Sequence, residues 1–170
     1  EFIGSRAFYG CTGLETLVLP DSLTGLGIRV FNRCTALREV TVGAGLTEIA
    51  DYMFYNCTEL ERIVLSDGVT AIGKYAFRGC EKLTEVTFPK TLEHIGDFAF
   101  LGCTSLRSVV LPASVKSIGN YAFRGLTSAT VICLRGNVES IGQHAFYGCR
   151  IATIYCESAG AGSGWHERFN

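Results

Sequence analysis

Cysteine is the residue type in this sequence that could most readily do chemistry, as a metal ligand, as half of a disulfide or as a nucleophilic thiol. The chain has 170 residues and eight of them are cysteines, a high count for an ordinary intracellular domain. A zinc site is usually marked by Cys-x-x-Cys pairs whose sulfurs converge at about 2.3 Å on one ion. No two cysteines here are closer than seven residues, so their spacing argues against a metal site.

The cysteines instead follow a repeat. A 23-residue step places the same residue types at the same point of seven units, and a period in the twenties is typical of solenoid proteins. The cysteine column contains Cys11, Cys34, Cys57, Cys80, Cys103 and Cys149, with Leu126 at the skipped position. The phenylalanine column contains Phe8, Phe31, Phe54, Phe77, Phe100, Phe123 and Phe146. An aliphatic column contains Ile3, Leu26, Ile49, Ile72, Ile95, Ile118 and Ile141.

The column cysteines have two interpretations besides metal binding. Stacked units would place their Cα atoms about 5 Å apart, within the range that a disulfide can bridge. In-register side chains lie parallel rather than facing each other, however, and Leu126 leaves one unit without a thiol. We therefore interpret the column as small buried hydrophobic residues with a weak S–H donor. Cys156, at an inward strand position, is interpreted in the same way, whereas Cys133 alternates with inward Ile132 and Leu134 and is expected to face outward.

The sequence offers no catalytic arrangement that the repeat predicts. His94, His144 and His166 have no ligand spacing, and His94 and His144 occupy different phases of the unit. A nucleophile and its base must lie within hydrogen-bond reach, and we expect no Ser-His-Asp or Cys-His set. The glycines of residues 160–164 lack the Lys and Ser/Thr that a P-loop requires. The sequence therefore predicts no enzyme, no cofactor and no metal site.

Each unit is expected to contain one strand and one short turn. Leu17 and Leu19 alternate with Thr16 and Val18, which predicts a strand with two inward and two outward side chains. The segment 120–125 is expected to form about one helical turn, closed by a residue of positive φ. That closing position is filled by Gly10, Arg33, Asn56, Gly79, Gly102, Gly125 and Gly148. Asparagine tolerates positive φ, so the strained exception is Arg33.

The whole unit is similar to the BspA-like, or Treponema pallidum-type, class of leucine-rich repeats. Residues 95–115, which read IGDFAFLGCTSLRSVVLPASV, carry nearly every position of that motif, and the resemblance runs from residue 3 to about residue 156. It implies an α/β repeat solenoid, a right-handed leucine-rich-repeat arc with a parallel β-sheet on its concave face and short helical or 3-10 turns on its convex side. It also implies a surface or secreted protein used in adhesion or binding, so an extracellular or cell-surface location rests on the resemblance alone.

We expect one solenoid over residues 1–156 and a tail or cap over residues 157–170. About seven repeats start near residues 3, 26, 49, 72, 95, 118 and 141. The motif decays toward the end, where Leu126 and Ala129 replace the usual cysteine and leucine. The last unit is one residue short between Cys149 and Ile154, and Trp165 is expected to fold back as a cap. The first unit shows no capping segment, which favours end-to-end self-association or further repeats before it.

Two columns of outward side chains on the concave sheet are candidate partner-binding residues. The first contains Thr16, Glu39, Arg62, Glu85, Ser108, Val131 and Thr153. The second contains Val18, Thr41, Val64, Thr87, Val110, Cys133 and Tyr155. Arg62 lies between Glu39 and Glu85, close enough for lateral ion pairs. Both columns would equally suit a parallel sheet that has no ligand.

An aromatic column on the turn side is a rival binding face. It contains Tyr52, Tyr75, Phe98 and Tyr121, flanked by Arg6, Arg29 and His144. Stacked rings that shield the edge of the core are an equally physical interpretation of this pattern.

The charge balance excludes some classes of partner. Fifteen basic residues against sixteen acidic ones give a net charge of −1, without the basic surplus of proteins that bind nucleic acid or anionic membranes. No apolar run approaches the roughly eighteen residues that a membrane-spanning helix needs. We therefore predict a non-catalytic module that binds a protein or other macromolecule at its concave face. The alternative is a structural spacer or array segment of a longer protein, with no ligand of its own.

Overall fold

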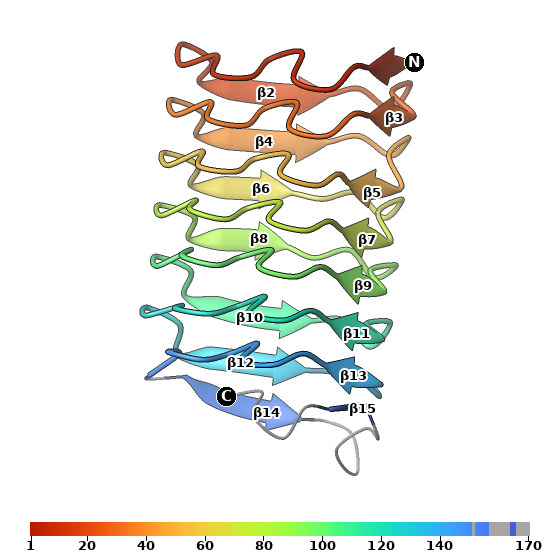
Figure 1. The fold of residues 1–170 in the computed structure, drawn as a ribbon. Helices are drawn as coiled ribbons and strands as arrows, with labels where there is room; N and C mark the ends of the chain where they lie inside the picture. Colours follow the sequence, from red (N-terminus) through yellow and green to blue (C-terminus); the bar gives the residue numbers. More distant parts are fainter. Residues whose placement is uncertain (151, 157–163, 166–170) are drawn as a thin grey trace.

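The computed structural model describes residues 1–150, 152–156 and 164–165. The chain winds into a stack of coils, most of which contribute one longer strand and one two-residue strand (Figure 1). The longer strands are β2 (Thr16–Leu19), β4 (Glu39–Val42), β6 (Arg62–Val64), β8 (Glu85–Thr87), β10 (Ser108–Leu111), β12 (Val131–Leu134) and β14 (Thr153–Cys156). The short strands are β1 (Phe2–Ile3), β3 (Gly25–Leu26), β5 (Glu48–Ile49), β7 (Ala71–Ile72), β9 (His94–Ile95), β11 (Ser117–Ile118), β13 (Ser140–Ile141) and β15 (Gly164–Trp165).

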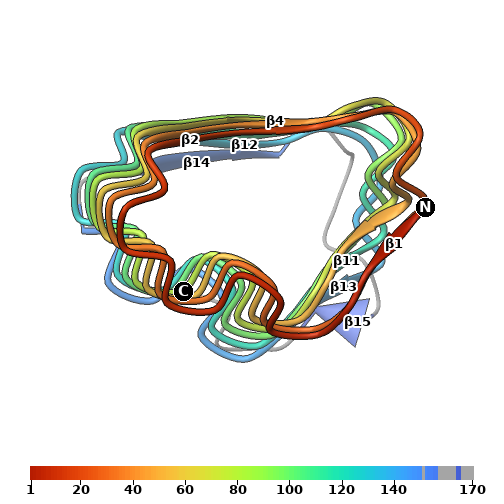
Figure 2. The same ribbon diagram turned by 90° about the horizontal axis from the view of Figure 1, so that it is seen from above.

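Every described strand pair is parallel and joins one coil to the next. The longer strands form a four-stranded sheet, β2-β4-β6-β8, followed by a three-stranded sheet, β10-β12-β14. The short strands form a pair, β1-β3, and a six-stranded sheet, β15-β13-β11-β9-β7-β5, which the sequence did not lead us to expect. Viewed along the stack, the coils superimpose, with the longer strands on one side (Figure 2). The predicted parallel solenoid of about seven repeats is confirmed.

The predicted helical or 3-10 turns are wrong, since the structure contains no helix among the residues it describes, and so none that could cross a membrane. The fold class is therefore all-β rather than α/β. The backbone N–H groups of the turn alternate in direction. Those of Tyr121 and Phe123 donate to Gln143 and Ala145 of the next coil at 2.9 and 2.8 Å, whereas that of Arg124 donates back to Tyr121 at 3.1 Å. An α-helix needs these donors to point back along its own chain, so inter-coil bonding prevents one.

Positive φ occurs at two positions of the turn rather than one. The predicted closing position is confirmed, with φ of 60° at Arg33 and 56° at Asn56. The second position, four residues earlier, was not predicted, and large side chains with φ between 53° and 60° occupy it in all seven coils: Arg6, Arg29, Tyr52, Tyr75, Phe98, Tyr121 and His144. In each of the first six of these coils the residue's N–H donates to a carbonyl of the following coil. The left-handed conformation thus aims this donor along the stack.

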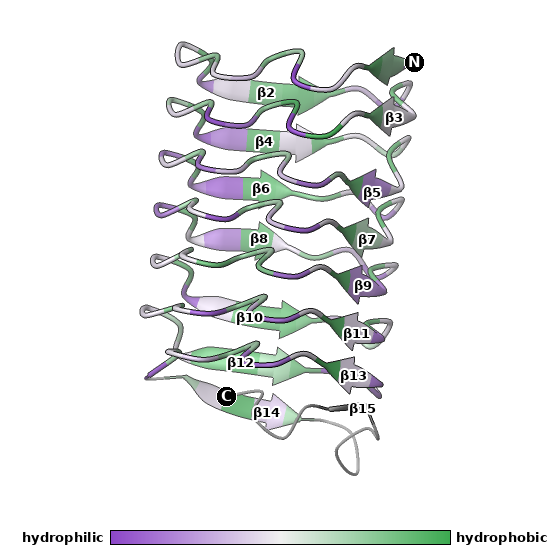
Figure 3. Cartoon of the chain, in the orientation of Figure 1, coloured by the Kyte–Doolittle hydropathy of each residue, from purple (hydrophilic) through white to green (hydrophobic). Residues whose placement is uncertain are grey.

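The core is a continuous apolar column inside the coils. The phenylalanine rings stack at centroid distances of 5.0–5.7 Å with interplanar angles of 3–14°, and all are buried except Phe8. Leu17 and Leu19 face this core while Thr16 and Val18 face outward, as predicted. Figure 3 shows the same alternation in β4, where a hydrophobic part lies between a hydrophilic start and a near-neutral part toward the arrowhead.

The end of the stack keeps the register. Val131 pairs with Thr153 and Ile132 with Ile154, a step of 22 residues that confirms the shorter last unit. The short strand β15 pairs with β13, with Trp165 opposite Ile141, so the six-stranded sheet continues to that point. The predicted tail over residues 157–170 otherwise lies outside the described residues.

Candidate functional site

The cysteine column is a buried ladder of thiols. Cys34, Cys57, Cys80 and Cys103 have no exposed surface. Each of them, and Cys149, donates its S–H to the backbone carbonyl of the column phenylalanine one coil earlier, at 3.2 Å. Burial raises the pKa of all five thiols, that of Cys34 to about 11. Because the thiolate is the nucleophile and the metal ligand, these five thiols are chemically inert, and their interpretation as buried residues with a weak donor is confirmed. Cys11, in the first coil, is only partly buried.

Two cysteines lie outside this ladder, on the longer strands. Cys133 faces outward between the buried Ile132 and Leu134, as predicted. Cys156 pairs in register with Leu134, but its side chain is exposed, so its interpretation as a buried residue is wrong. It lies on β14, and no other described strand pairs with the outer edge of β14. Across the described ranges, no group of three or more His, Cys, Asp or Glu residues could hold a metal ion.

The strand face is the outward side of the longer strands, and the register assembles both predicted columns on it. Thr16, Glu39, Arg62 and Glu85 stack in the first column, which Ser108, Val131 and Thr153 continue in the second sheet. Arg62 donates to a carboxylate oxygen of Glu39 at 3.2 Å, and both side chains are more than half exposed. Of its two column neighbours, the arginine therefore pairs with Glu39.

The second column of the strand face leaves apolar side chains in solvent. Val18 is 74% exposed, Val64 39%, Val110 41% and Tyr155 54%. Thr41 and Thr87 lie between the valines, and Cys133 lies between Val110 and Tyr155. Exposed valines thus alternate with threonines along this column, and exposed apolar side chains gathered on one face often mark an interaction surface.

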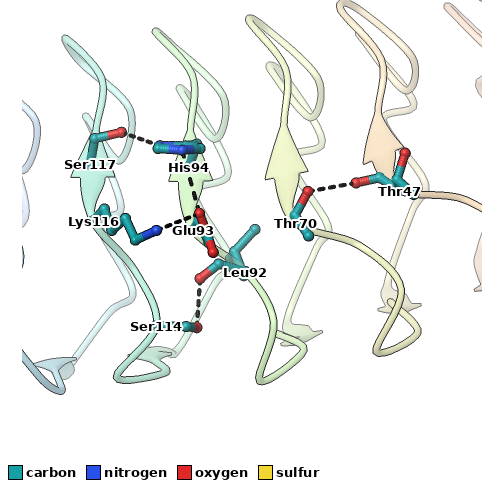
Figure 4. Close-up of polar contacts among 8 residues, drawn as sticks. All are labelled: Thr47, Thr70, Leu92, Glu93, His94, Ser114, Lys116 and Ser117. Carbon is teal, nitrogen blue, oxygen red and sulfur yellow. Dashed lines mark hydrogen bonds and ion pairs between the residues drawn. The ribbon is translucent and has the colours of Figure 1, made fainter.

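On the short-strand side, stacking brings together a serine, a histidine and a carboxylate that we had not connected (Figure 4). His94 Nδ1 lies 2.8 Å from Ser117 Oγ, and His94 Nε2 lies 3.8 Å from Glu93 Oε2. The signal was present in the sequence, because Ser117 follows His94 by one 23-residue step.

This group lacks the features that would make Ser117 a nucleophile. In a catalytic triad the carboxylate bonds to the imidazole, but Glu93 accepts a 2.7 Å bond from Lys116, which holds the pKa of the carboxyl below its usual range. The side chain of His94 is 55% exposed. The backbone N–H of Ser117 is bonded to the Glu93 carbonyl at 3.2 Å, so it is not available to an oxyanion. The contacts therefore link coils rather than assemble an active site.

The Arg–Tyr face is the outer surface of the turns, and the rival aromatic column lies within it. Its residues are Arg6, Tyr9, Arg29, Asn32, Arg33, Tyr52, Tyr55, Tyr75, Arg78, Phe98, Leu101, Tyr121, Arg124, His144 and Tyr147. The rings of Tyr52, Tyr75, Phe98 and Tyr121 stack at centroid distances of 4.8, 4.8 and 5.1 Å. The guanidinium of Arg29 lies 4.5 Å from the centroid of the Tyr52 ring, within cation–π range.

Two hollows open on the Arg–Tyr face. The first, of about 590 Å³, is lined by Arg6, Tyr9, Arg29, Asn32, Arg33, Tyr52 and Tyr55. The second, of about 280 Å³, is lined by Tyr121, Arg124, His144 and Tyr147. We had not predicted Tyr9, Asn32, Arg33 or Tyr55 as site residues. The available signal was a fixed spacing: Asn32 and Tyr55 each lie three residues after a column residue, Arg29 and Tyr52, on the same turn.

Comparison with known proteins identifies the family of the repeat. The BspA type leucine-rich repeat region matches residues 1–66 and 47–161, in six copies. The chain belongs to this family. The BspA-type chain has no significant match among curated proteins.

Three solved structures share its fold. A leucine-rich repeat protein from Bacteroides ovatus is 30% identical, with a TM-score of 0.83 over 92% of this chain and 40% of that one. The T. pallidum leucine-rich repeat protein is 32% identical, with a TM-score of 0.68 over 92% and 63%. A leucine-rich cell surface protein from Faecalibacterium prausnitzii is 25% identical, with a TM-score of 0.66 over 93% and 52%. The BspA-type chain thus spans less than two thirds of each of these proteins.

Proposed function

We propose that this BspA-type chain is a non-catalytic module that binds another macromolecule, a protein, through its strand face. The observation that carries the proposal is the exposed stripe of Val18, Val64 and Val110. The fold requires outward side chains at these positions but not apolar ones, since Thr41 and Thr87 fill the equivalent position on the neighbouring strands β4 and β8. We take this face as the concave side of the arc that the family resemblance implies.

Support for a surface location comes from one structural relative. The F. prausnitzii protein is described as a cell surface protein, and we propose the same setting, with a role in adhesion, for the BspA-type chain. A rigid stacked sheet suits such a role, because side chains on it lose little conformational freedom on binding.

A spacer or array segment is the second candidate function. The chain corresponds to only 40–63% of the length of the three solved relatives, and coil-to-coil hydrogen bonds satisfy the backbone without any ligand. In that case neither face would need a partner.

Binding measurements on a panel of purified extracellular proteins distinguish the two functions. The strand-face variant is Val64→Lys with Val110→Lys, and Ile28→Lys is the matched control because Ile28 is 46% exposed but lies off this face. We expect a partner whose binding is lost in the strand-face variant and kept in the control. A second variant, with reversed charges at Glu39, Arg62 and Glu85, tests the first column. An interaction that survives both strand-face variants would refute recognition through this face, and absence of any interaction would favour the spacer.

A further inference from the structure

The arginines of the Arg–Tyr face are not neutralised by carboxylates. The six ion pairs of the described chain use Arg38, Arg62, Lys74, Lys82, His94 and Lys116 as cations. None of the five arginines on the Arg–Tyr face takes part in them. Each of the seven turn segments begins two residues after the aliphatic column and ends at the cysteine column. Together these segments hold six Lys or Arg residues and two acidic residues. A chain of net charge −1 thus concentrates a positive surplus on one side.

The two acidic residues of the turns are already engaged with the backbone. Asp51 Oδ1 accepts the N–H of Lys74 at 2.7 Å, and Asp97 Oδ1 accepts the N–H of Asn120 at 2.8 Å. Neither lines the first hollow, whose seven lining residues include three arginines and no acid. An anionic group that entered this hollow would therefore meet uncompensated positive charge.

The first hollow also contains a polar side chain that the fold leaves unused. Asn32 is only 4% exposed and lines the hollow. Its backbone N–H and carbonyl are both bonded. Its side-chain amide reaches solvent in the hollow, since among the described residues the side-chain polar atom that is both buried and unpartnered is His144 Nδ1. In this position the amide can serve both a donor and an acceptor of a ligand, as a peptide bond requires.

Arg33 occupies its place at a cost to the fold. Its φ is 60°, and at the equivalent position five of the other six coils have glycine and one has asparagine. Both of those residues tolerate the left-handed region better than arginine does. The N–H of Arg33 donates to the carbonyl of Tyr55 in the next coil at 2.8 Å, so the left-handed conformation serves the stack here as it does at Arg29. The side chain of Arg33 is exposed and directed to the hollow that it lines with Arg6 and Arg29.

Aromatic rings hold several of the arginines in place. Arg29 lies over Tyr52 at 4.5 Å, and Arg78 donates to the Tyr55 hydroxyl at 2.7 Å while its guanidinium lies 5.7 Å from the Tyr75 centroid. A guanidinium positioned in this way keeps donors free for a bidentate bond to a carboxylate. Tyrosine and arginine are also the residues that dominate binding energy at protein interfaces.

We propose that the Arg–Tyr face binds an acidic peptide segment of a partner protein, with its carboxylates on Arg6, Arg29 and Arg33 in the first hollow. Recognition of acidic motifs by arginine clusters is a known mode of peptide binding. The coil after the first hollow adds Lys74 and Arg78, and the following coil presents Phe98 and Leu101, with no cation in residues 97–103. An evenly charged polyanion would find a gap there, whereas a peptide with acidic residues followed by apolar ones matches the order of side chains. This proposal goes beyond recognition through the strand face and uses different residues.

Fluorescence anisotropy with labelled peptides tests the proposal. The probe is a short acidic peptide of Glu and Tyr followed by Leu, and its counterpart replaces every Glu with Gln. The hollow variant combines Arg6→Gln, Arg29→Gln and Arg33→Asn, the last chosen because Asn56 occupies the equivalent position. The control variant combines Arg38→Gln, Lys82→Gln and Lys116→Gln, which removes the same charge from cations that have carboxylate partners. Circular dichroism and thermal unfolding establish that both variants fold.

We expect the acidic peptide to bind and the Gln peptide to bind at least tenfold more weakly, by analogy with other charge-assisted contacts, which are worth about tenfold or more each. The hollow variant should lose about tenfold or more in affinity and the control less than about twofold. Equal losses in both variants would overturn the proposal, because net charge alone would then explain binding. Binding of a sulfated polysaccharide but not of the acidic peptide would overturn the assigned partner class. Strand-face variants should leave this binding unchanged, so failure here leaves the proposed function standing.

Discussion

The buried thiol ladder makes the stability of this protein depend on pH in the alkaline range. Burial holds the pKa of Cys80 well above its usual value, whereas a cysteine in an unfolded chain titrates near pH ~8.5. Below that pH both states keep the proton, and the stabilisation is fully present. Above it the unfolded state releases the proton while the native state retains it, so the free energy of unfolding falls as pH rises.

The variant Cys80→Ala isolates this effect. At neutral pH it should lower the free energy of unfolding by about 1 kcal/mol, as loss of a methyl-sized buried group does. Because the native state retains the Cys80 proton, each pH unit above the unfolded pKa lowers the free energy of unfolding of the wild type by about 1.4 kcal/mol. The loss is about 2 kcal/mol at pH ~10. The two stability curves should therefore cross near pH ~9.2, with the variant less stable below and more stable above.

Urea unfolding followed by far-UV circular dichroism, under reducing conditions and across this pH range, measures both curves. The pH dependence that both proteins share cancels in the difference between their two curves. Val109→Ala is the matched control, because Val109 is fully buried and its truncation removes no thiol. Its curve should stay parallel to that of the wild type. A Cys80→Ala curve that is also parallel would refute the reasoning.

Two further predictions concern accessibility and backbone packing. On alkylation with iodoacetamide, the exposed Cys156 should react first and Cys80 only on unfolding, as read by peptide mass mapping; equal rates would contradict the assigned burial. Gly119→Ala should lower the free energy of unfolding by about 1–3 kcal/mol in urea titrations, because its Cβ would lie 2.5 Å from the backbone nitrogen of Asp97. Gly13→Ala, where a Cβ meets nothing within 4 Å, should change the free energy of unfolding by less than about 0.5 kcal/mol. Equal losses in the two variants would show that close approach of the coils does not require glycine at position 119.

The longer strands and their register could be predicted because one unit contains all the information they need, whereas the sheet of short strands was not expected. Alternation around Leu17 fixes which side chains face inward, and the 23-residue step fixes which residues become neighbours. The turn could not be predicted in the same way. The segment around Tyr121 has residues that suit a helix, and the competing use of its N–H groups by the next coil appears only when coils are stacked.

The two candidate faces differ in how much of them the sequence shows. The strand face follows from period-two alternation, so both of its columns could be named residue by residue. The first hollow of the Arg–Tyr face depends on Asn32 and Arg33, which fill positions that hold Leu101 and Gly102 three coils later. The repeat contains Arg33 only as an exception to glycine, and Asn32 belongs to no predicted column, so the spatial arrangement of neighbouring turns is what reveals that they share one hollow with Arg29.

The 22-residue step between Val131 and Thr153 shows that the circumference of a coil is adjustable. A one-residue shift inside a strand would exchange its two faces, yet here Ile154 still pairs with Ile132, because the missing residue lies before β14 begins. The pairing register is therefore kept while the segment before the strand takes up the difference. Descendants of such a chain could lengthen or shorten that segment without changing which side chains the strand face presents.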